Sequence, residues 1–163
     1  MRRKDREVTD HDEIMSMIDS CSIIRFGLAD GDYPYIVPVN FSYKEDGGRL
    51  AFYIHGALAG RKYELLNKNG KCSFEMDIPL GMECIEESHD VTERYMSVMG
   101  TAGVSFVPDD EKKSIIDSVI MARYPETRNF RYNEAAISRT MIAKLTVESI
   151  SAKANRPRSG ADI

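Results

Sequence analysis

Hydrophobic and polar residues alternate along several short stretches of the chain, and a period of two residues is typical of strands with one buried face. The clearest stretch runs from Tyr35 to Ser42, and a second follows at 50–55, after turn-forming residues at 45–48. Another turn at 30–32 separates Tyr35 from an earlier apolar run. The predicted strands cover residues 21–29, 35–42, 50–55, 72–76, 95–107 and 141–148.

Three helices are predicted between these strands. The first covers 10–20, where Asp10 is a suitable N-cap and Glu13 stands three residues later, as in a capping box. The second begins near Arg61 and ends at Gly70, a residue suited to a left-handed helix end. The third follows Pro108 and ends near Tyr124-Pro125; its apolar stripe consists of Ile115, Ile116, Val119 and Ile120.

Most of the predicted strands are joined by connections of hairpin length, which favours an antiparallel barrel over a doubly wound sheet. The predicted fold class is mainly β with flanking helices, as a six-stranded, Greek-key-like antiparallel barrel. Gly100 and Gly103 lie within one long strand and indicate a bend or bulge. The acidic segment 77–94 is expected to be an exposed excursion.

Length and composition indicate one globular domain, expected at 1–153 with a polar tail at 154–163, because 163 residues with 42% hydrophobic content suit a single core. The net charge of −4 argues against a nucleic-acid partner. Three cysteines without short spacing indicate neither disulfides nor a metal site. No signal peptide or membrane span is apparent, so a cytoplasmic protein without a membrane partner is expected.

The segment from His55 to Lys62 is the strongest candidate for a binding site. Its small residues leave backbone N–H groups accessible at a helix start, where an anion is stabilised. Arg61 and Lys62 add a bidentate fork and a point charge, which together suit a phosphate. The alternative is a loop of small residues followed by two solvated helix cations.

The strand from Tyr33 to Phe41 contains Pro34 and Pro38. Each proline removes a ladder donor, which restricts the segment to a sheet edge, a strand start or a bulge. A planar ring that forms hydrogen bonds would fit beside such a backbone. The alternative is an edge strand that its prolines protect from aggregation, with no ligand.

Five motifs follow one another along the chain: Arg2–Glu7, Pro34–Asn40, Phe52–Ala57, Gly60–Lys62 and Tyr95–Gly100. In this order they resemble the pyridoxamine 5′-phosphate oxidase-like flavoproteins, especially the nitroimidazole-reductase branch. The resemblance extends from residue 1 to about 153. It implies an FMN-binding split β-barrel that forms a homodimer and holds one FMN in each of two clefts between the subunits.

The resemblance also implies roles for individual residues. Arg61 and Lys62 would bind the FMN phosphate, helped by the Gly60 amide and the turn at 55–57. The strand from 37 to 41 would lie along the isoalloxazine ring, with the backbone of Val39 and Asn40 bonding its edge. The expected cofactor-binding residues are therefore Val37, Pro38, Val39, Asn40, Phe41, Ile54, His55, Ala57, Gly60, Arg61 and Lys62.

His55 is the candidate catalytic residue, since the resemblance places it near the flavin and the substrate. An imidazole can donate a hydrogen bond to a nitro or carbonyl oxygen; the alternative is a histidine that only orders the phosphate loop. The expected function is an FMN-dependent oxidoreductase acting on nitroaromatic or quinone-like small molecules. The alternatives are a flavin- or haem-binding sensor without turnover and a dimer module without ligand. The chain has no tryptophan, unlike the vitamin oxidases, so vitamin oxidation is not expected.

Overall fold

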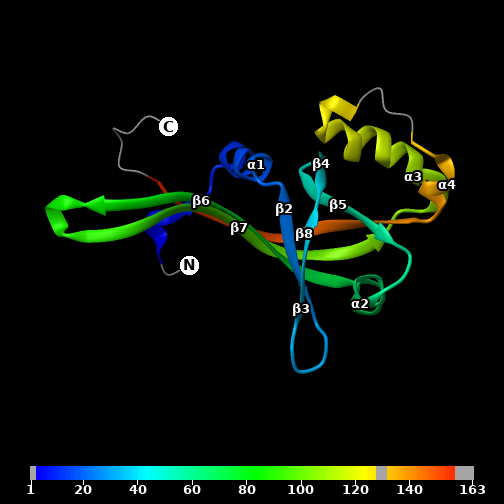
Figure 1. Ribbon diagram of the computed structural model, residues 1–163, viewed down its shortest axis with the longest axis horizontal. Coiled ribbons are helices and arrows are strands. Elements are labelled where there is room, and N and C mark those ends of the chain that lie inside the picture. The colour runs from blue at the N-terminus through cyan, green and yellow to red at the C-terminus, as the bar shows by residue number, and fades with distance from the viewer. Residues whose placement is uncertain (1–2, 128–131, 157–163) are drawn as a thin grey trace.

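The computed structural model describes residues 3–127 and 132–156, whose strands form one antiparallel sheet. Its hydrogen-bonded order is β3-β2-β6-β7-β8-β5-β4, and β1 pairs with β8. Along the chain the strands are β1 (Glu7–Val8), β2 (Ile23–Leu28), β3 (Tyr35–Asn40), β4 (Ser42–Asp46), β5 (Arg49–Ala57), β6 (Lys71–Ile85), β7 (Asp90–Phe106) and β8 (Thr140–Asn155). The sheet curls into a barrel that is open between β3 and β4 (Figure 1).

Phe41 separates these two edge strands. β3 pairs with β2 and β4 pairs with β5, so the chain passes from one edge of the sheet to the other at this residue. The sequence pattern predicted a single strand through 35–42, because the alternation of apolar and polar residues continues through the crossing. The described part of the chain therefore has eight strands instead of the six expected.

The segment 77–94, expected as an exposed excursion, is a continuation of two strands. β6 and β7 stay paired from Lys71↔Gly103 to Ile85↔Asp90, and their far half, residues 79–95, forms an arm that extends away from the barrel (Figure 1). A register shift between Pro79 and Gly81 marks the start of the arm. The predicted bend near Gly100 is also present, as a register shift between Thr101 and Ala102 on β7.

The helices lie around the barrel and were mostly predicted. They are α1 (His11–Ser20), α2 (Arg61–Asn69), α3 (Asp109–Ile115) and α4 (Glu134–Ser138); a π-helical turn (Ile116–Ile120) and a 3-10 turn (Met121–Arg123) extend α3. The Asp10 side chain accepts a hydrogen bond from the Glu13 amide, which confirms the predicted cap of α1. None of the helices in the described ranges is long and apolar enough to span a membrane.

The main core fills the barrel with aromatic and aliphatic side chains. Phe52 is fully buried, and its ring meets Phe41 edge-on at 5.6 Å and Phe74 at 5.1 Å between ring centroids. A second cluster lies under the π-helical turn, where Val119 packs against Tyr53 and Ile142. The segment after α3 thus covers the opposite face of β5 and β8, whereas α1 and α2 contribute side chains to the main core.

Candidate functional site

The predicted phosphate-binding segment lies where β5 ends and α2 begins. Gly60 precedes the helix with φ of 100° and ψ of 168°, a backbone conformation that favours glycine. The helix is anchored by Leu65 and Leu66, which are buried in the main core. The open N–H groups of its first turn therefore have a fixed direction, as an anion-binding helix start requires.

Arg61 already has an anionic partner in the protein. Its Nε donates to the Asp30 carboxylate at 2.6 Å, and its Nη2 contacts the same group. The guanidinium also lies 5.9 Å from the centroid of the Tyr35 ring. The side chain is 64% exposed, so one face of the fork stays accessible. Arg61 therefore connects the start of α2 to the turn before β3.

Lys62 has a different environment from Arg61. Its side chain is half-buried, and it forms no hydrogen bond or ion pair with any residue in the described ranges. Burial lowers the pKa of this ammonium. A Cβ at position 56 would lie 2.8 Å from Lys62 Nζ, so Gly56 is what allows the ammonium to approach β5. A partly desolvated cation without a counter-charge is expected to bind an anion.

β3 is the edge strand that its prolines predicted. It pairs with β2 alone among the described strands. Val37 and Val39 pack against the core, while Pro38 and Asn40 point outward and are exposed. The free edge of β3 therefore offers backbone groups to a ligand.

Phe41 and Ile54 belong to the core instead of to an open site. Both side chains are buried, at 2% and 0% exposure. Any ligand contact from these two positions would therefore come from the backbone. Ala57, the last residue of β5, is exposed.

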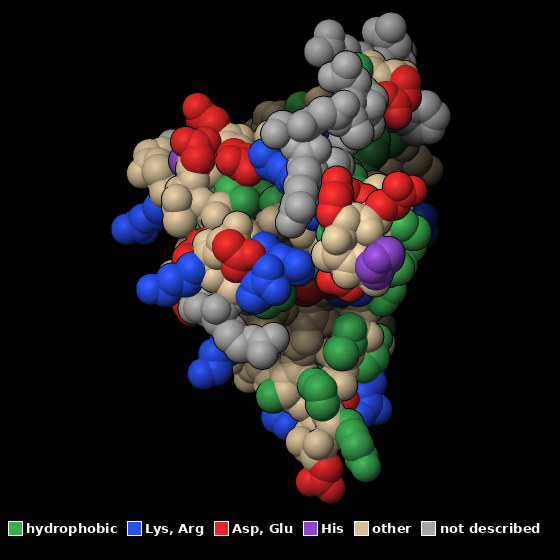
Figure 2. Space-filling view, turned by 90° about the vertical axis from the view of Figure 1, so that its left-hand side faces the viewer, with side chains coloured by type: hydrophobic (Ala, Val, Ile, Leu, Met, Phe, Trp, Pro, Cys, Tyr) green, Lys and Arg blue, Asp and Glu red, His purple; other side chains and the backbone are tan. Residues whose placement is uncertain are grey.

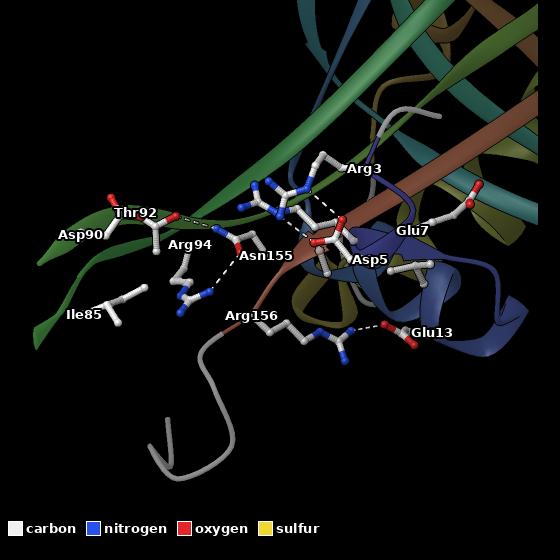
Figure 3. A pocket seen from close by; sticks show the side chains of 13 residues that line it. Arg3, Asp5, Glu7, Glu13, Ile85, Asp90, Thr92, Arg94, Asn155 and Arg156 are labelled. Atoms are coloured by element: carbon white, nitrogen blue, oxygen red, sulfur yellow. Dashed lines mark hydrogen bonds and ion pairs between the residues drawn. The ribbon is translucent and has the colours of Figure 1, made fainter. Parts of the chain in front are cut away.

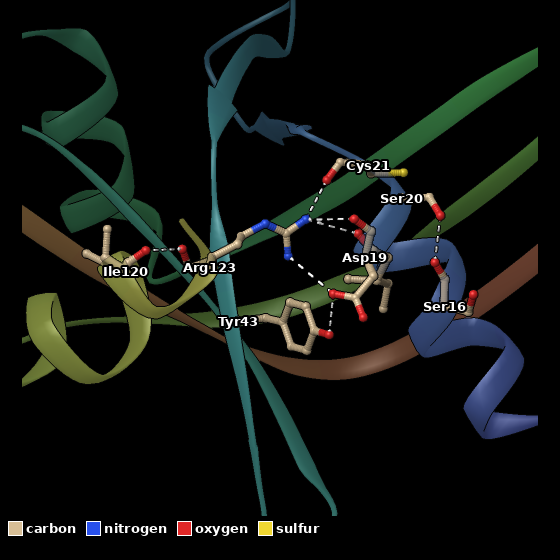
Figure 4. Close-up of polar contacts among 9 residues, drawn as sticks. Ser16, Asp19, Ser20, Cys21, Tyr43, Ile120 and Arg123 are labelled. Carbon is tan, nitrogen blue, oxygen red and sulfur yellow. Dashed lines mark hydrogen bonds and ion pairs between the residues drawn. The ribbon is translucent and has the colours of Figure 1, made fainter. Parts of the chain in front are cut away.

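Arg123 fixes the crossing between β3 and β4. Its Nη2 donates to the carbonyl oxygens of Ile18 at 3.3 Å and Cys21 at 2.6 Å, at the end of α1 (Figure 4). Its guanidinium lies 4.5 Å above the ring centroid of Phe41 and 5.5 Å from that of Tyr43. One arginine thus ties the helical segment after α3 to α1 and to the chain on both sides of the crossing.

His55 is exposed on β5 and lies beside two cavities. A crevice holds His55 together with Asn40, and a larger cavity of about 240 Å³ joins it to the apolar residues Ile116, Ile120 and Ile137. The imidazole forms no hydrogen bond or ion pair with the residues that the structure describes. His55 is therefore available to a ligand in either cavity.

β3 connects the two ends of this candidate site. Tyr35, at its start, lies under Arg61, and Asn40, at its end, lies beside His55. A strand rises about 3.3 Å per residue, so six residues separate the two ends by roughly 17 Å. An elongated ligand with an anionic group at one end and a ring at the other matches this arrangement.

Sequence reasoning missed three residues of the site. Asp30 was assigned only to a turn, and Tyr35 only to a strand, yet both contact Arg61. Gly56 was grouped with the small residues of the loop, but its role is to accommodate Lys62. The sequence contains no direct indication of the contacts of Asp30 and Tyr35 with Arg61, which lie 31 and 26 residues apart in the chain.

Comparison with known proteins supports this description of the fold. The family model described as pyridoxamine 5′-phosphate oxidase matches residues 10–154. No curated protein matches the chain.

Several solved structures share the architecture. A candidate 5-nitroimidazole antibiotic resistance protein from Bacteroides thetaiotaomicron is 27% identical, with a TM-score of 0.75 over 91% of this chain and 86% of that one. A FAD and heme binding protein from Mycobacterium smegmatis is 17% identical, with a TM-score of 0.79 over 96% and 77%. A flavocytochrome from Azotobacter vinelandii is also 17% identical, with a TM-score of 0.78 over 99% and 75%. The fold is accordingly the split barrel, and the predicted fold class is confirmed.

Proposed function

The chain belongs to the pyridoxamine 5′-phosphate oxidase family, and from this premise we propose that it is a flavin-dependent oxidoreductase that binds FMN. The observation that carries the proposal is the half-buried ammonium of Lys62 beside the start of α2, which has no hydrogen-bond or ion-pair partner within residues 3–127 and 132–156. A phosphate monoester carries a charge of about −1.5 to −2 at neutral pH and would neutralise the positive charge of this ammonium. The residues present therefore fit the phosphate end of FMN.

The phosphate end would be held by three groups of this chain. Lys62 supplies a point charge, and the first amides of α2 after Gly60 supply hydrogen-bond donors. Arg61 supplies further N–H donors, and its hydrogen bond to Asp30 keeps the guanidinium oriented. A flavin at this site would supply electron or hydride transfer, and the protein would supply position and electrostatics.

The ring end would lie along β3, near His55. The free edge of β3 offers backbone hydrogen bonds, and the adjoining cavity of about 240 Å³ is mainly apolar. A planar, uncharged substrate suits such a cavity, and His55 would donate a hydrogen bond to its oxygen atoms. We therefore propose nitroaromatic or quinone-like substrates. The 27% identical protein described for 5-nitroimidazole resistance supports the first class.

The proposed oligomer is a homodimer with the cofactor in the cleft between subunits. The β2–β3 hairpin carries exposed apolar side chains, including Tyr33 at 84% and Ile36 at 63% exposure. Figure 2 shows hydrophobic side chains gathered on the lower end of the molecule, where Figure 1 places this hairpin. Covering this surface with a second copy would remove it from water beside the proposed ring site.

A comparison of flavins tests the phosphate assignment. Protein freed of flavin should bind FMN at least tenfold more tightly than riboflavin, which lacks the phosphate. Lys62→Gln should remove most of this preference, as measured by flavin fluorescence quenching. Lys68→Gln, on the exposed last turn of the same helix, is the matched control and should keep it. Equal affinity for FMN and riboflavin in the unmodified protein would refute the assignment.

Turnover needs a separate measurement. The flavin-loaded protein should be bleached by a reduced nicotinamide and reoxidised by a nitroimidazole under anaerobic conditions. His55→Ala should slow reoxidation without releasing the flavin, because the residue is exposed and is expected to contact the substrate. A protein that binds FMN but is never reoxidised by any nitroaromatic or quinone is a flavin-binding protein without this activity.

A further inference from the structure

A further cavity lies at the opposite end of the molecule from α2. Its volume is about 570 Å³, and we call it the arm pocket. It is enclosed by the N-terminal segment, α1, the arm and the last residues of β8 (Figure 3). In Figure 1 these elements lie on the left, whereas α2 lies on the right. The arm pocket is therefore separate from the proposed flavin site.

Arg94 is the reason to regard the arm pocket as a binding site. The residue is only 7% exposed, yet it lines the cavity from β7. Its Nε pairs with Glu83, and its Nη1 donates to Asn155 Oδ1 at 3.0 Å. Its Nη2 is buried and has no hydrogen-bond partner among the residues that the structure describes. An unpaired donor of a buried guanidinium costs free energy unless a ligand accepts its hydrogen bond.

The position of Arg94 is fixed by a polar network. Asn155, which is 6% exposed, accepts from Arg94 and donates through Nδ2 to Thr92 Oγ1 at 3.1 Å and to the Glu93 carbonyl at 2.6 Å. Both ends of this amide are therefore used. The guanidinium is held in one orientation before any ligand arrives, and such preorganisation favours binding.

A second arginine, Arg6, lines the same cavity. Arg6 is half-buried, and its guanidinium lies 6.0 Å from the ring centroid of Tyr95. It forms no ion pair within the described ranges. The other two arginines of the pocket are neutralised locally, Arg3 by Asp5 and Arg156 by Glu13. The cavity thus offers the unused Nη2 donor of Arg94, whose charge is matched by Glu83, and the guanidinium of Arg6, and together these donors suit a phosphate group.

The rest of the lining includes carboxylates, which restrict the class of ligand. Asp5, Glu7 and Asp90 border the cavity, and the Arg3 guanidinium lowers the pKa of Asp5 to about 2. Figure 2 shows Asp, Glu, Lys and Arg side chains side by side on this face. Carboxylates repel a purely anionic molecule but accept hydrogen bonds from hydroxyl groups. The preferred ligand therefore has an anionic end and a hydroxylated body.

We propose that the arm pocket binds a small phosphate ester of a hydroxylated molecule, with the phosphate on Arg94 and Arg6 and the hydroxyl groups on the surrounding carboxylates. A cavity of about 570 Å³ is within the range of small-molecule sites. The site does not depend on the proposed flavin, since it shares no lining residue with the segment 55–62.

Isothermal titration of the purified protein, with its flavin bound if it carries one, tests the proposal. The probes are ribose 5-phosphate, inorganic phosphate and ribose. We expect ribose 5-phosphate to bind more tightly than inorganic phosphate, and ribose not to bind. Arg6→Gln should weaken ribose 5-phosphate binding by about tenfold or more, because it removes one charged partner.

Three further variants test whether ribose 5-phosphate binds in the arm pocket and not elsewhere on the protein. Arg94→Gln should abolish binding, while Arg6→Gln keeps the test valid if the buried substitution prevents folding. Arg25→Gln removes an exposed arginine on β2 and should leave binding unchanged. Lys62→Gln should also leave it unchanged, although it is expected to weaken FMN. The proposal is overturned if folded protein does not bind ribose 5-phosphate at millimolar concentration, if Arg6→Gln and Arg94→Gln bind it normally, or if Lys62→Gln abolishes binding.

Discussion

The barrel and the arm share the strands β6 and β7 but are held by different interactions. In the barrel half, Phe74, Met76 and Val98 are buried and pack in the main core. In the arm, residues 79–95, apolar side chains such as Met82 and Val91 are exposed, and the buried side chain is the charged Arg94. A ladder of backbone hydrogen bonds can therefore extend far beyond the core, provided that a local polar network supports it.

The comparison predicts that loss of an apolar side chain is costly in the barrel and tolerated in the arm. Phe52→Ala should lower the free energy of unfolding by about 3–5 kcal/mol, because it leaves a cavity between two other rings. Val91→Ala, at a 56% exposed position in the arm, should change it by less than about 0.5 kcal/mol. Urea denaturation measures both. Similar losses for the two variants would mean that the arm has a core of its own in solution.

The barrel half of β7 should not accommodate a side chain at Gly100, which pairs with Phe74 on β6. An added Cβ would lie 2.0 Å from the Ser149 carbonyl oxygen and 2.7 Å from Phe74 Cζ. Gly100→Ala should therefore destabilise the protein by about 1–3 kcal/mol or more. Gly27→Ala on β2 is the control, since an added Cβ there meets nothing within 4 Å. Thermal unfolding of the two variants should differ clearly, and equal melting temperatures would show that the β7–β8 pairing at the bulge is looser than described.

The hydrogen bonds of Asn155 should stabilise the arm without affecting the barrel. Asn155→Ala removes an acceptor from Arg94 and two donated hydrogen bonds, which should cost about 1–3 kcal/mol. We expect faster amide exchange in residues 79–95 and unchanged exchange around Phe52. Hydrogen-exchange mass spectrometry resolves the two regions. Uniformly faster exchange would indicate that the arm and the barrel unfold as one unit.

The reactivity of two cysteines, one in the barrel and one in the arm, measures the difference in burial between these two regions. Burial raises the pKa of the Cys72 thiol in the barrel to about 11, whereas Cys84 in the arm is exposed. At pH 8 a thiol reagent should therefore modify Cys84 quickly and Cys72 slowly. Because the folded state disfavours the Cys72 thiolate, stability should fall as the pH rises from about 9 to about 11. Cys72→Ala should reduce this dependence; rapid labelling of Cys72 at pH 8 would contradict its burial.

Much of the fold could be predicted from local patterns. The Asp10 cap, the end of α2 at Gly70 and the alternation in β3 and β5 depend on residues close in sequence. The arm was not predicted as two paired strands, because Pro79, Gly81 and the acidic residues interrupt the alternation. Its strands form because each has the other as a partner across the register from Pro79↔Tyr95 to Ile85↔Asp90.

The candidate site shows the same division. The segment from His55 to Lys62 was recognised from its small residues and adjacent cations, and the assignment of FMN to it stays a prediction. From the sequence, Arg61 and Lys62 were both expected to bind one phosphate, as a bidentate fork and a point charge. The tertiary contacts add a difference in their surroundings, because Asp30 pairs with Arg61 while Gly56 lets Lys62 approach β5.

By itself the sequence determined the strand and helix periodicities, the caps and the motifs of the family, since these depend on neighbouring residues and on backbone preferences. Only the tertiary structure decided which charges are paired. Arg94 stands in an acidic, polar segment and gives no local indication of burial. It is buried because Asn155, 61 residues later, and Glu83 converge on it when β8 and β6 pair with β7.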